Sequence, residues 1–267
     1  MEPITSVRNA RVRELAALAR RRERRSTGRH LVEGPNAVTE ALDAGVVEEV
    51  FGTDEALARI TVPVGIRVQP VAEHVLERLA DATTPQGVVA VAVSRTASLS
   101  EVVGRGLLVV LHEVADPGNA GTIIRTADAA GATGVVLTAG SVDPFAPKTV
   151  RAAVGSTYHL PLVVDVTLAE VAAACGGVGQ PLLGLDAAGS REVFDLERMS
   201  SPLALVLGNE AHGLEPDGAA LLDDVVAIPR WGRAESLNVA AAAAVAVYAA
   251  ARATHHVPAM PGRPPVG

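Results

Sequence analysis

The stretch Ile228–Arg252, IPRWGRAESLNVAAAAAVAVYAAAR, decides the fold. It begins at the end of an expected strand, turns at Trp231-Gly232 and enters a helix near Ser236, whose hydroxyl is a good N-cap by type. From there the helix carries alanine and valine on every face, so we expect it to be buried inside a domain or a dimer. Polar side chains at the mouth of a buried helix need hydrogen-bond partners. For Ser236 capping is the simpler interpretation. For Asn238 a ligand-binding or catalytic role is as reasonable as capping.

The composition limits the class of protein. A chain of 267 residues is long enough for one large domain or two of ordinary size. A single cysteine, Cys175, excludes a disulfide framework and a cysteine-based zinc site, and the pattern predicts no metal. No signal peptide and no apolar run long enough to span a bilayer are visible, so we expect a cytoplasmic protein without a membrane partner.

The charge is distributed unevenly. The net charge is −7, but residues 1–30 hold nine arginines against three glutamates, so this segment is +6 and the rest of the chain is −13. Such a run can be a solvated helix face. However, its density covers more than one face of a helix and favours an anionic partner, most often nucleic acid. The candidate RNA-binding residues are Arg20, Arg21, Arg22, Arg24 and Arg25.

Short apolar strands alternate with helices along the whole chain, which predicts an α/β fold. Residues 1–98 form a small first domain, and the polar stretch Ser94–Ser100 is the candidate linker. A second domain is expected over residues 107–254, and the proline- and glycine-rich residues 255–267 form a tail that should not pack. The expected strands of the second domain are Leu107–Leu111, Gly134–Leu137, Leu160–Val164, Leu182–Leu185, Leu203–Leu207 and Val225–Ile228.

Most of these strands are continuous apolar runs, as in a parallel sheet that is covered on both faces. Ligands of such sheets bind beyond the carboxyl ends of the strands. Three strand-ending loops carry unusual residues: Asp116–Ala127 (DPGNAGTIIRTA), Gly208–Leu214 (GNEAHGL) and the opening stretch. Neither a Walker loop nor a G-x-G-x-x-G turn is present, which argues against a cofactor bound through its pyrophosphate.

These three loops together resemble one family. N-x-G-x-x-x-R-T-A at Asn119–Ala127, L-G-N-E-x-x-G at Leu207–Gly213 and I-P-x-x-G-x-x-E-S-L-N-V at Ile228–Val239 resemble the three motifs of the SpoU (TrmH-like) RNA 2′-O-ribose methyltransferases of the SPOUT superfamily. The resemblance extends from about Leu107 to Ala251. The first domain is similar, more weakly, to the L30e-like substrate-binding domain of many members. Arg230-Trp231 departs from the family pattern at the expected substrate rim.

The resemblance implies a deep trefoil knot in the second domain, bound S-adenosyl-L-methionine, and a homodimer whose active site takes residues from both subunits. The catalytic residues carried over by motif are Asn119, Arg125, Glu210, Ser236 and Asn238. The cofactor-binding residues carried over are Leu185, Leu207, Gly208, Asn209, Gly213, Ile228, Pro229 and Leu237.

The implied reaction moves a methyl group from a sulfonium to a ribose 2′-hydroxyl. The family proposal makes the arginine, here Arg125, the general base, but a guanidinium with a pKa above about 12 rarely gives up its proton. We therefore favour Arg125 as a phosphate ligand that stabilises a developing alkoxide, although the sequence leaves both roles open. Arg125 also stands beside Ile123 and Ile124, where burial without a partner would be costly.

The substrate and two other functions stay open in the sequence. Ribosomal RNA, 23S in particular, is favoured over transfer RNA because the extra first domain suits an extensive, structured target. A non-enzymatic RNA-binding protein would have no reason to keep the five catalytic candidates together. A nicotinamide-dependent oxidoreductase would need a glycine-rich dinucleotide turn, which the chain lacks.

Overall fold

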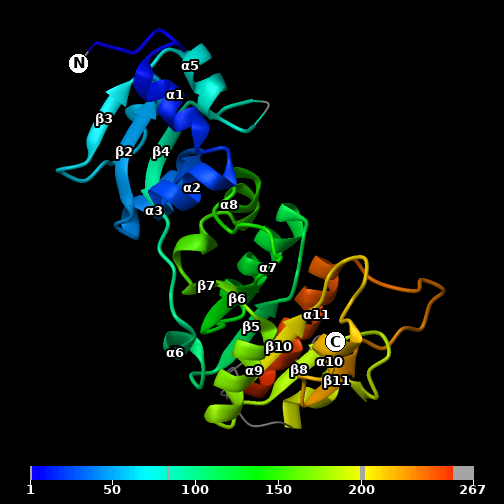
Figure 1. The fold of residues 1–267 in the computed structure, drawn as a ribbon. Helices are drawn as coiled ribbons and strands as arrows, with labels where there is room; N and C mark the ends of the chain where they lie inside the picture. The colour runs from blue at the N-terminus through cyan, green and yellow to red at the C-terminus, as the bar shows by residue number, and fades with distance from the viewer. Residues whose placement is uncertain (1, 83, 199–201, 255–267) are drawn as a thin grey trace, which may run out of the picture.

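Two separate β-sheets divide the chain into an N-terminal and a C-terminal part (Figure 1). The computed structural model describes residues 2–82, 84–198 and 202–254. Within this part of the chain, no helix is both long enough and apolar enough to cross a membrane.

The N-terminal sheet has four strands in the order β1-β4-β2-β3. Strand β4 is antiparallel to β1 and β2, and β2 is parallel to β3. Alternate residues of β4 point to opposite faces, so that Ala90 packs with α3 whereas Val91 packs with α1 and α5. The bounds are β1 (Arg29–Glu33), β2 (Val47–Gly52), β3 (Arg67–Pro70), β4 (Val88–Val93), α1 (Ala10–Ala17), α3 (Pro35–Asp43), α4 (Asp54–Leu57) and α5 (Glu73–Leu79).

The arginine-rich segment forms two helices. Helix α1 ends at Ala17, and α2 (Arg21–Thr27) follows after Arg20, whose backbone is extended. Gly28 then ends α2 in the left-handed conformation, with φ of 65°, which glycine adopts without steric cost. The break places α2 next to the C-terminal part of the molecule (Figure 1), where Arg21, Arg24 and Arg25 contact acidic residues.

The C-terminal sheet has seven parallel strands in the order β7-β6-β5-β10-β8-β11-β9. The middle strands β5, β6 and β10 are buried along their whole length, as their continuous apolar sequences predict. The bounds are β5 (Leu107–Leu111), β6 (Gly134–Thr138), β7 (Leu162–Val166), β8 (Leu182–Leu185), β9 (Arg191–Glu192), β10 (Leu203–Leu207) and β11 (Asp224–Ala227).

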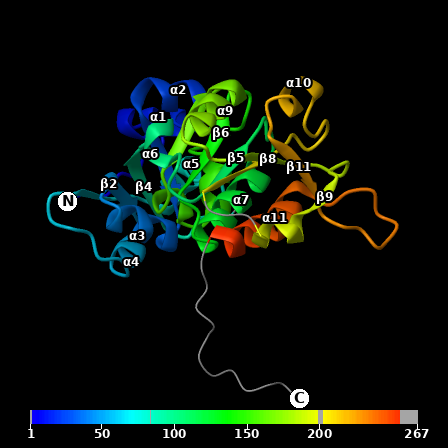
Figure 2. The ribbon, with the colours of Figure 1, turned by 90° about the horizontal axis from the view of Figure 1, so that it is seen from below.

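Helices cover both faces of this sheet (Figure 2). One face carries α7 (Pro117–Ala129), α8 (Pro147–Ala153) and α11 (Val239–Thr254), and the other carries α6 (Leu99–Val102), α9 (Leu168–Gly177) and α10 (Pro216–Ala219). Helices α7 and α8 approach closely at Gly121, where a Cβ atom would lie 2.5 Å from the carbonyl oxygen of Thr149. Two 3-10 helices, η1 (Ser156–Tyr158) and η2 (Val193–Arg198), complete this part.

Three expectations about local structure need correction. The expected linker Ser94–Ser100 runs into α6, because Ser98 and Glu101 form a capping box that starts a helix at Leu99. The last helix begins at Val239, and its cap is the side chain of Asn238, which accepts hydrogen bonds from the N–H groups of Ala240 and Ala241.

The third correction concerns the burial of α11. Ala243, Ala246 and Val247 are buried in the core, but Ala241, Ala244 and Tyr248 are exposed along one side of the helix. Within the described residues nothing covers this apolar face, and its burial by a second copy stays a prediction.

Polar contacts join the two parts. The ring of His30 in β1 lies between the hydroxyls of Ser94 and Tyr158, at 3.0 Å from each, and stacks on Tyr158. Burial lowers the pKa of His30 to about 3, and the nearby Arg24 acts in the same direction. His30 is therefore neutral and serves as a fixed structural element of the interface.

Candidate functional site

A pocket of about 540 Å³ lies beyond the carboxyl ends of β8, β10 and β11. This is the edge of a parallel sheet where ligands bind, and the volume is that of a small-molecule site. Eleven of the thirteen catalytic and cofactor residues predicted from the sequence line it. They are Asn119, Leu185, Leu207, Gly208, Asn209, Glu210, Gly213, Ile228, Ser236, Leu237 and Asn238.

The two remaining residues lie elsewhere. Pro229 does not line the pocket, although its neighbours Ile228 and Arg230 do. The side chain of Arg125 is exposed on α7 and, within the described residues, makes neither a hydrogen bond nor an ion pair. It is therefore not one of the buried arginines of this fold, and it lies outside the pocket of its own chain.

The loop after β10 is shaped by glycine. A Cβ atom at Gly208 would lie 2.5 Å from the backbone carbon and oxygen of Gly213, a contact that only a backbone shift could relieve. Asn209 and Gly213 exchange backbone hydrogen bonds of 2.9 and 3.0 Å, and Gly213 is left-handed with φ of 65°. The two glycines therefore make a tight loop whose backbone forms part of the pocket wall.

Asn209 uses its side chain to hold two loops together. Its Nδ2 donates to the carbonyl oxygen of Glu113 after β5 at 2.8 Å, and its Oδ1 accepts from the N–H of Ala211 at 2.8 Å. Both ends of the amide are used by the protein. Asn209 thus fixes the shape of the loop that lines the pocket.

A row of hydrogen bonds joins three of the predicted catalytic residues. Nδ2 of Asn238 donates to Oδ1 of Asn119 at 3.2 Å, and Nδ2 of Asn119 donates to Oε1 of Glu210 at 3.1 Å. The three residues come from the start of α7, the loop after β10 and the start of α11, so the fold unites positions 91 and 119 residues apart. The row fixes the orientation of the Asn119 amide.

Glu210 is further held by the backbone at the start of α7. Its carboxylate accepts from the N–H groups of Ala115 and Asp116, each at 3.1 Å. Partial burial acts to raise the pKa of Glu210, but the hydrogen bonds from Asn119 and from the backbone outweigh it, so the pKa lies below its usual value. Glu210 is an anion at neutral pH.

Asn119 owes its position to the way α7 begins. Asp116 is the N-cap, with its carboxylate accepting from the N–H of Asn119 at 2.8 Å, and Pro117 occupies the first helical position. Lys148, at 3.6 Å from Asp116, adds to the hydrogen bonds that lower the pKa of this carboxyl. Asn119 is therefore placed in the first turn, facing the pocket.

The loop from β11 to α11 forms the outer rim. Ser236 and Leu237 line the pocket but are exposed, and Trp231 is 88% exposed. Arg230 donates to the carbonyl oxygens of Glu235 and Ala187, which ties the loop to the end of β8. Within the described residues the backbone of Leu237 makes no hydrogen bond, so its N–H and C=O remain for a ligand.

The pocket suits S-adenosyl-L-methionine. Leu185, Leu207 and Ile228 offer an apolar wall for a purine, and the exposed backbone beside Leu237 can hydrogen-bond to its edge. The anionic groups at the pocket are Asp186 and Glu210, so it presents carboxylates to a cationic ligand such as a sulfonium. In the part of the chain that the structure describes, no group of three or more His, Cys, Asp or Glu side chains could hold a metal ion.

Sequence reasoning missed some of the lining residues. Asp186 follows β8 directly, and the rule that predicts ligands at strand ends could have identified it. Ala242 carries no sequence signal, because it belongs to the alanine-rich helix. Val239 closes the third motif and Arg230 is expected at the substrate rim, but neither was named as a site residue. The other lining residues that were missed are Asp186, Ala187, Ala211 and Ala242.

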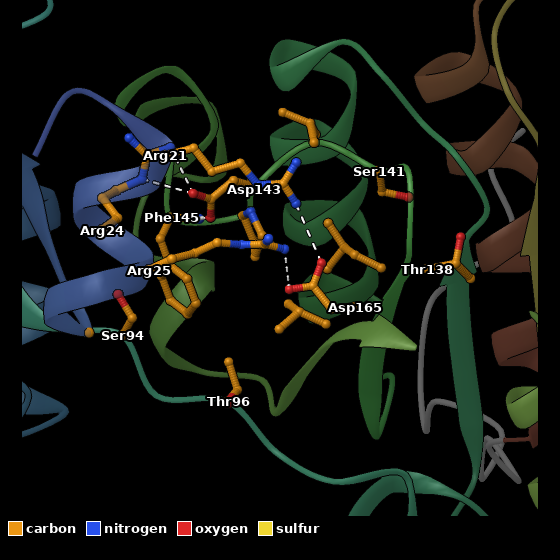
Figure 3. A pocket seen from close by; sticks show the side chains of 15 residues that line it. Arg21, Arg24, Arg25, Ser94, Thr96, Thr138, Ser141, Asp143, Phe145 and Asp165 are labelled. Carbon is orange, nitrogen blue, oxygen red and sulfur yellow. Dashed lines mark hydrogen bonds and ion pairs between the residues drawn. The ribbon is translucent and has the colours of Figure 1, made fainter. Parts of the chain in front are cut away.

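A second, smaller pocket of about 170 Å³ lies where α2 meets the ends of β6 and β7 (Figure 3). Arg21 and Arg25 both contact the carboxylate of Asp165, the first at 3.5 Å (Figure 3). Asp165 has a left-handed backbone, with φ of 58°. Two of the predicted RNA-binding arginines are thus paired with an acid of the C-terminal part.

Arg24 does not fit the expected RNA-binding role. Only 5% of this residue is exposed, and its Nε and Nη2 atoms lie 2.8 and 2.7 Å from Oδ2 of Asp143. Its Nη1 donates to the carbonyl oxygens of Leu18 and Ala19 (Figure 3 shows Arg24 beside Asp143). A buried guanidinium with all its groups in use joins the two parts of the chain and is closed to RNA. The run of arginines gave no sign of this pairing, because the sequence alone does not show which of the arginines face inward.

Comparison with known proteins agrees with this geometry. The model of the SpoU rRNA Methylase family matches residues 106–248, and that of the MRM3-like substrate binding domain matches residues 9–90. The chain is 37% identical over 259 residues to the 23S rRNA (guanosine(2553)-2′-O)-methyltransferase RlmP of Bacillus subtilis, covering 93% of this chain and 98% of the relative.

Two further proteins are similar over almost the whole chain. The 23S rRNA (uridine(2479)-2′-O)-methyltransferase of Streptomyces viridochromogenes is 33% identical, with 93% of this chain and 91% of the relative covered. The crystal structure of an AdoMet-bound rRNA methyltransferase from Sinorhizobium meliloti superposes with a TM-score of 0.85 at 34% identity, covering 94% of this chain and 97% of that one.

Proposed function

The chain belongs to the SpoU rRNA methylase family and is an S-adenosylmethionine-dependent RNA 2′-O-methyltransferase, and we propose that its substrate is 23S ribosomal RNA. The observation that supports the reaction best is the row Asn238–Asn119–Glu210 at the edge of a pocket that fits the cofactor. The substrate rests on the relatives, two of which are named as 23S rRNA methyltransferases, and on the matched substrate-binding domain. The proposed compartment is the cytoplasm, where ribosomal RNA is found.

The cofactor is held by the three strand-ending loops. Leu185, Leu207 and Ile228 would hold the adenine, and backbone groups of Gly208 and Leu237 would hydrogen-bond to the cofactor. When bound, S-adenosyl-L-methionine supplies a methyl group that is already activated by its sulfonium. The protein then has to align the ribose hydroxyl in line with the methyl group and to assist the loss of the hydroxyl proton.

The catalytic residues divide this work. Glu210 stays ionised and orients Asn119, whose amide positions the target nucleotide, while Asn238 holds the other end of that amide. Ser236 lies at the rim and contacts the incoming ribose. Arg125 binds the adjacent phosphate and stabilises the developing alkoxide, since a guanidinium keeps its proton at neutral pH. The hydroxyl proton then passes to solvent water, and the donor sulfonium is left as a neutral thioether.

The position of Arg125 supports a shared active site. It is exposed outside the pocket of its own chain, so a second copy would have to bring its Arg125 to this pocket. The uncovered apolar face of α11 offers the contact surface, and Phe194 (47% exposed) and Tyr248 (51% exposed) lie at its groove. We therefore propose a homodimer formed through α11.

The chain path supports a trefoil knot. Strand β10 lies between β5 and β8, and the final helix returns to pack under β10 and β5 instead of remaining beside β11. In this proposal the segment that returns from β11 to α11 forms the knot, and its loops form the cofactor pocket. Such knots are rare among proteins.

Two measurements test the function. Calorimetry should detect binding of S-adenosyl-L-methionine and none of a nicotinamide dinucleotide. Mapping of 2′-O-methyl groups in RNA from a strain that lacks the gene should then show one missing modification in 23S rRNA. A missing site in transfer RNA instead would overturn the substrate, and intact methylation together with no cofactor binding would leave a non-enzymatic RNA-binding protein.

A further inference from the structure

The nine arginines of residues 1–30 separate into two groups in the structure. Five are paired with acids: Arg11 with Glu14 and Glu49, Arg21 and Arg25 with Asp165, Arg24 with Asp143, and Arg29 with Glu48. The other four, Arg8, Arg13, Arg20 and Arg22, have no ion pair within the described residues and are exposed. The excess charge of the segment therefore resides in this second group.

Two arginines of the second group line one groove. The groove has a volume of about 440 Å³ and is lined by Arg13, Ala16, Ala17, Arg20 and Arg78. The first four residues have the spacing i, i+3, i+4, i+7, which places them along one face of α1 and the turn that follows it. Arg78 comes from α5, which packs against α1 (Figure 1).

The chemistry of this groove favours a phosphate backbone. Arg78 is exposed and, like Arg13 and Arg20, has no ion pair in the described part of the chain. No acidic side chain is among the residues that line the groove, and the two alanines form a floor without bulk. Three uncompensated guanidinium groups from two segments far apart in the sequence leave a surface that attracts an anion and lets it come close.

The groove is far from the reaction. Helices α1 and α5 lie at the end of the molecule opposite to β8, β11 and the cofactor pocket (Figure 1). A ligand that reaches both must be large and polyanionic, which an extended, folded RNA is. From this we propose that Arg13, Arg20 and Arg78 form a phosphate-binding groove for the RNA backbone, an inference that rests on the RNA substrate proposed above.

The groove changes which arginines we expect to contribute to RNA binding. Arg21 and Arg25 already have the Asp165 carboxylate, and Arg24 is buried, so their replacement acts on the junction between the two parts. Arg13 and Arg78 become binding residues although neither belongs to the dense run of arginines. Phosphate contacts carry no sequence information, so the groove positions the RNA and leaves the choice of nucleotide to the active site.

The test replaces Arg13, Arg20 and Arg78 together by Gln and measures binding to in vitro transcribed 23S rRNA and to bulk transfer RNA at several salt concentrations. Each lost phosphate contact lowers the slope of log affinity against log salt by about 0.7–0.9, so the slope should flatten by about 2–3. Calorimetry should show unchanged affinity for S-adenosyl-L-methionine, and circular dichroism an unchanged fold.

A charge-matched control replaces Arg59, Arg67 and Arg105, which are exposed outside the groove. It should change the slope by less than about 1. An unchanged slope in the groove variant, or an equal loss in the control, overturns the groove while leaving the RNA substrate intact. A parent protein that binds neither RNA overturns the substrate proposal and the groove together.

Discussion

Asn119 and Arg125 belong to the same helix, α7, yet only Asn119 lines the cofactor pocket. Six residues separate them, which in an α-helix is about 9 Å along the axis and a rotation of about 240°. The two side chains therefore leave α7 on different sides of the helix. Because the first turn of α7 is fixed by Asp116 and Glu210, this arrangement favours the proposal that the arginine of each site comes from a second copy.

Mixing two inactive variants tests this shared site. Arg125→Ala and Glu210→Gln should each reduce methyl transfer by about 10²-fold or more, the scale of a lost catalytic group. Refolded together, they form mixed dimers in which one site has both native residues. Random pairing should then restore turnover to about a quarter of the parent value. Turnover is measured with tritiated S-adenosyl-L-methionine.

Two controls accompany the mixture. Arg125→Ala should bind S-adenosyl-L-methionine within a few-fold of the parent, and Arg125→Lys should recover little turnover because a point charge does not replace a two-pronged contact. No recovery in the mixture, with mixed dimers demonstrated by mass spectrometry, would show that each site is built from one chain.

A glycine substitution tests whether the loop after β10 holds the cofactor, as proposed. Gly208→Ala places a methyl group 2.5 Å from the backbone of Gly213, so the loop must move and the affinity for S-adenosyl-L-methionine should fall at least ~10-fold, the scale of about 1.4 kcal/mol. Gly176→Ala in α9 meets nothing within 4 Å and should stabilise the fold by about 0.5–1 kcal/mol. Calorimetry and urea denaturation measure the two effects; undiminished affinity in Gly208→Ala would show that the loop does not hold the cofactor.

The strand pattern explains how much of the fold the sequence could predict. Leu107–Leu111 and Leu203–Leu207 are apolar without interruption and begin and end in the structure where the sequence predicts. Short elements were harder to predict from the sequence. Strand β9 is only Arg191–Glu192, and it forms because it pairs with β11. No local sequence pattern reports such a contact between two segments.

The site was predictable to the extent that its residues follow strands. Strand ends and motif spacing place Glu210 and Asn119 in one pocket, but the sequence does not tell that Asn238 replaces Ser236 as the helix cap. Arg24 shows the limit most clearly. Its partner Asp143 is 119 residues away, and Arg24 does not differ by type from the exposed Arg22 and Arg25 beside it.

The proposed dimer face can be tested without disturbing the core. Tyr248 is half exposed, so Tyr248→Glu should leave a folded monomer while preventing association, because the charge would be buried in the interface. Ala243 on the same helix is fully buried within the chain, so Ala243→Glu should unfold the protein instead. Sedimentation velocity and circular dichroism separate the two results. A Tyr248→Glu variant that still sediments as a dimer would place the interface elsewhere.

His159 predicts a pH dependence of stability. Its ring lies 3.0 Å from Glu40 of α3 and 2.8 Å from Asp128 of α7, and these two hydrogen-bonded carboxylates raise its pKa. A raised pKa stabilises the fold fully below the unfolded-state pKa of about 6.5, and this contribution is lost as the pH rises through the folded-state pKa. The free energy of unfolding should therefore decline above about pH 6.5.

The variant His159→Gln should weaken that decline, because glutamine can hydrogen-bond to one carboxylate but does not titrate. His74→Gln is the control, since His74 contacts the carbonyl oxygen of Thr5 instead of a carboxylate. Urea denaturation across this pH range gives the free energies. An equal decline in His159→Gln and in the parent would assign the pH dependence to other groups.

The pair Arg24–Asp143 allows the last prediction, on the junction between the two parts. Arg24→Met leaves the mostly buried carboxylate of Asp143 and the carbonyl oxygens of Leu18 and Ala19 without their partner, and it should lower the free energy of unfolding by about 3–5 kcal/mol. Adding Asp143→Asn removes the unpaired charge but keeps the acceptor for the N–H of Phe145, so the double variant should recover part of the loss.

Arg25→Met provides the comparison, because its pair with Asp165 is half exposed and exposed pairs contribute about 1 kcal/mol or less. Urea denaturation of the parent, Arg24→Met, Asp143→Asn and the double variant gives the coupling between Arg24 and Asp143, and Arg25→Met is measured beside them. If Arg24→Met lowers the free energy of unfolding no more than Arg25→Met does, the buried pair does not hold the N-terminal part in place. The His30–Tyr158 and Glu40–His159 contacts would then have to fix the junction.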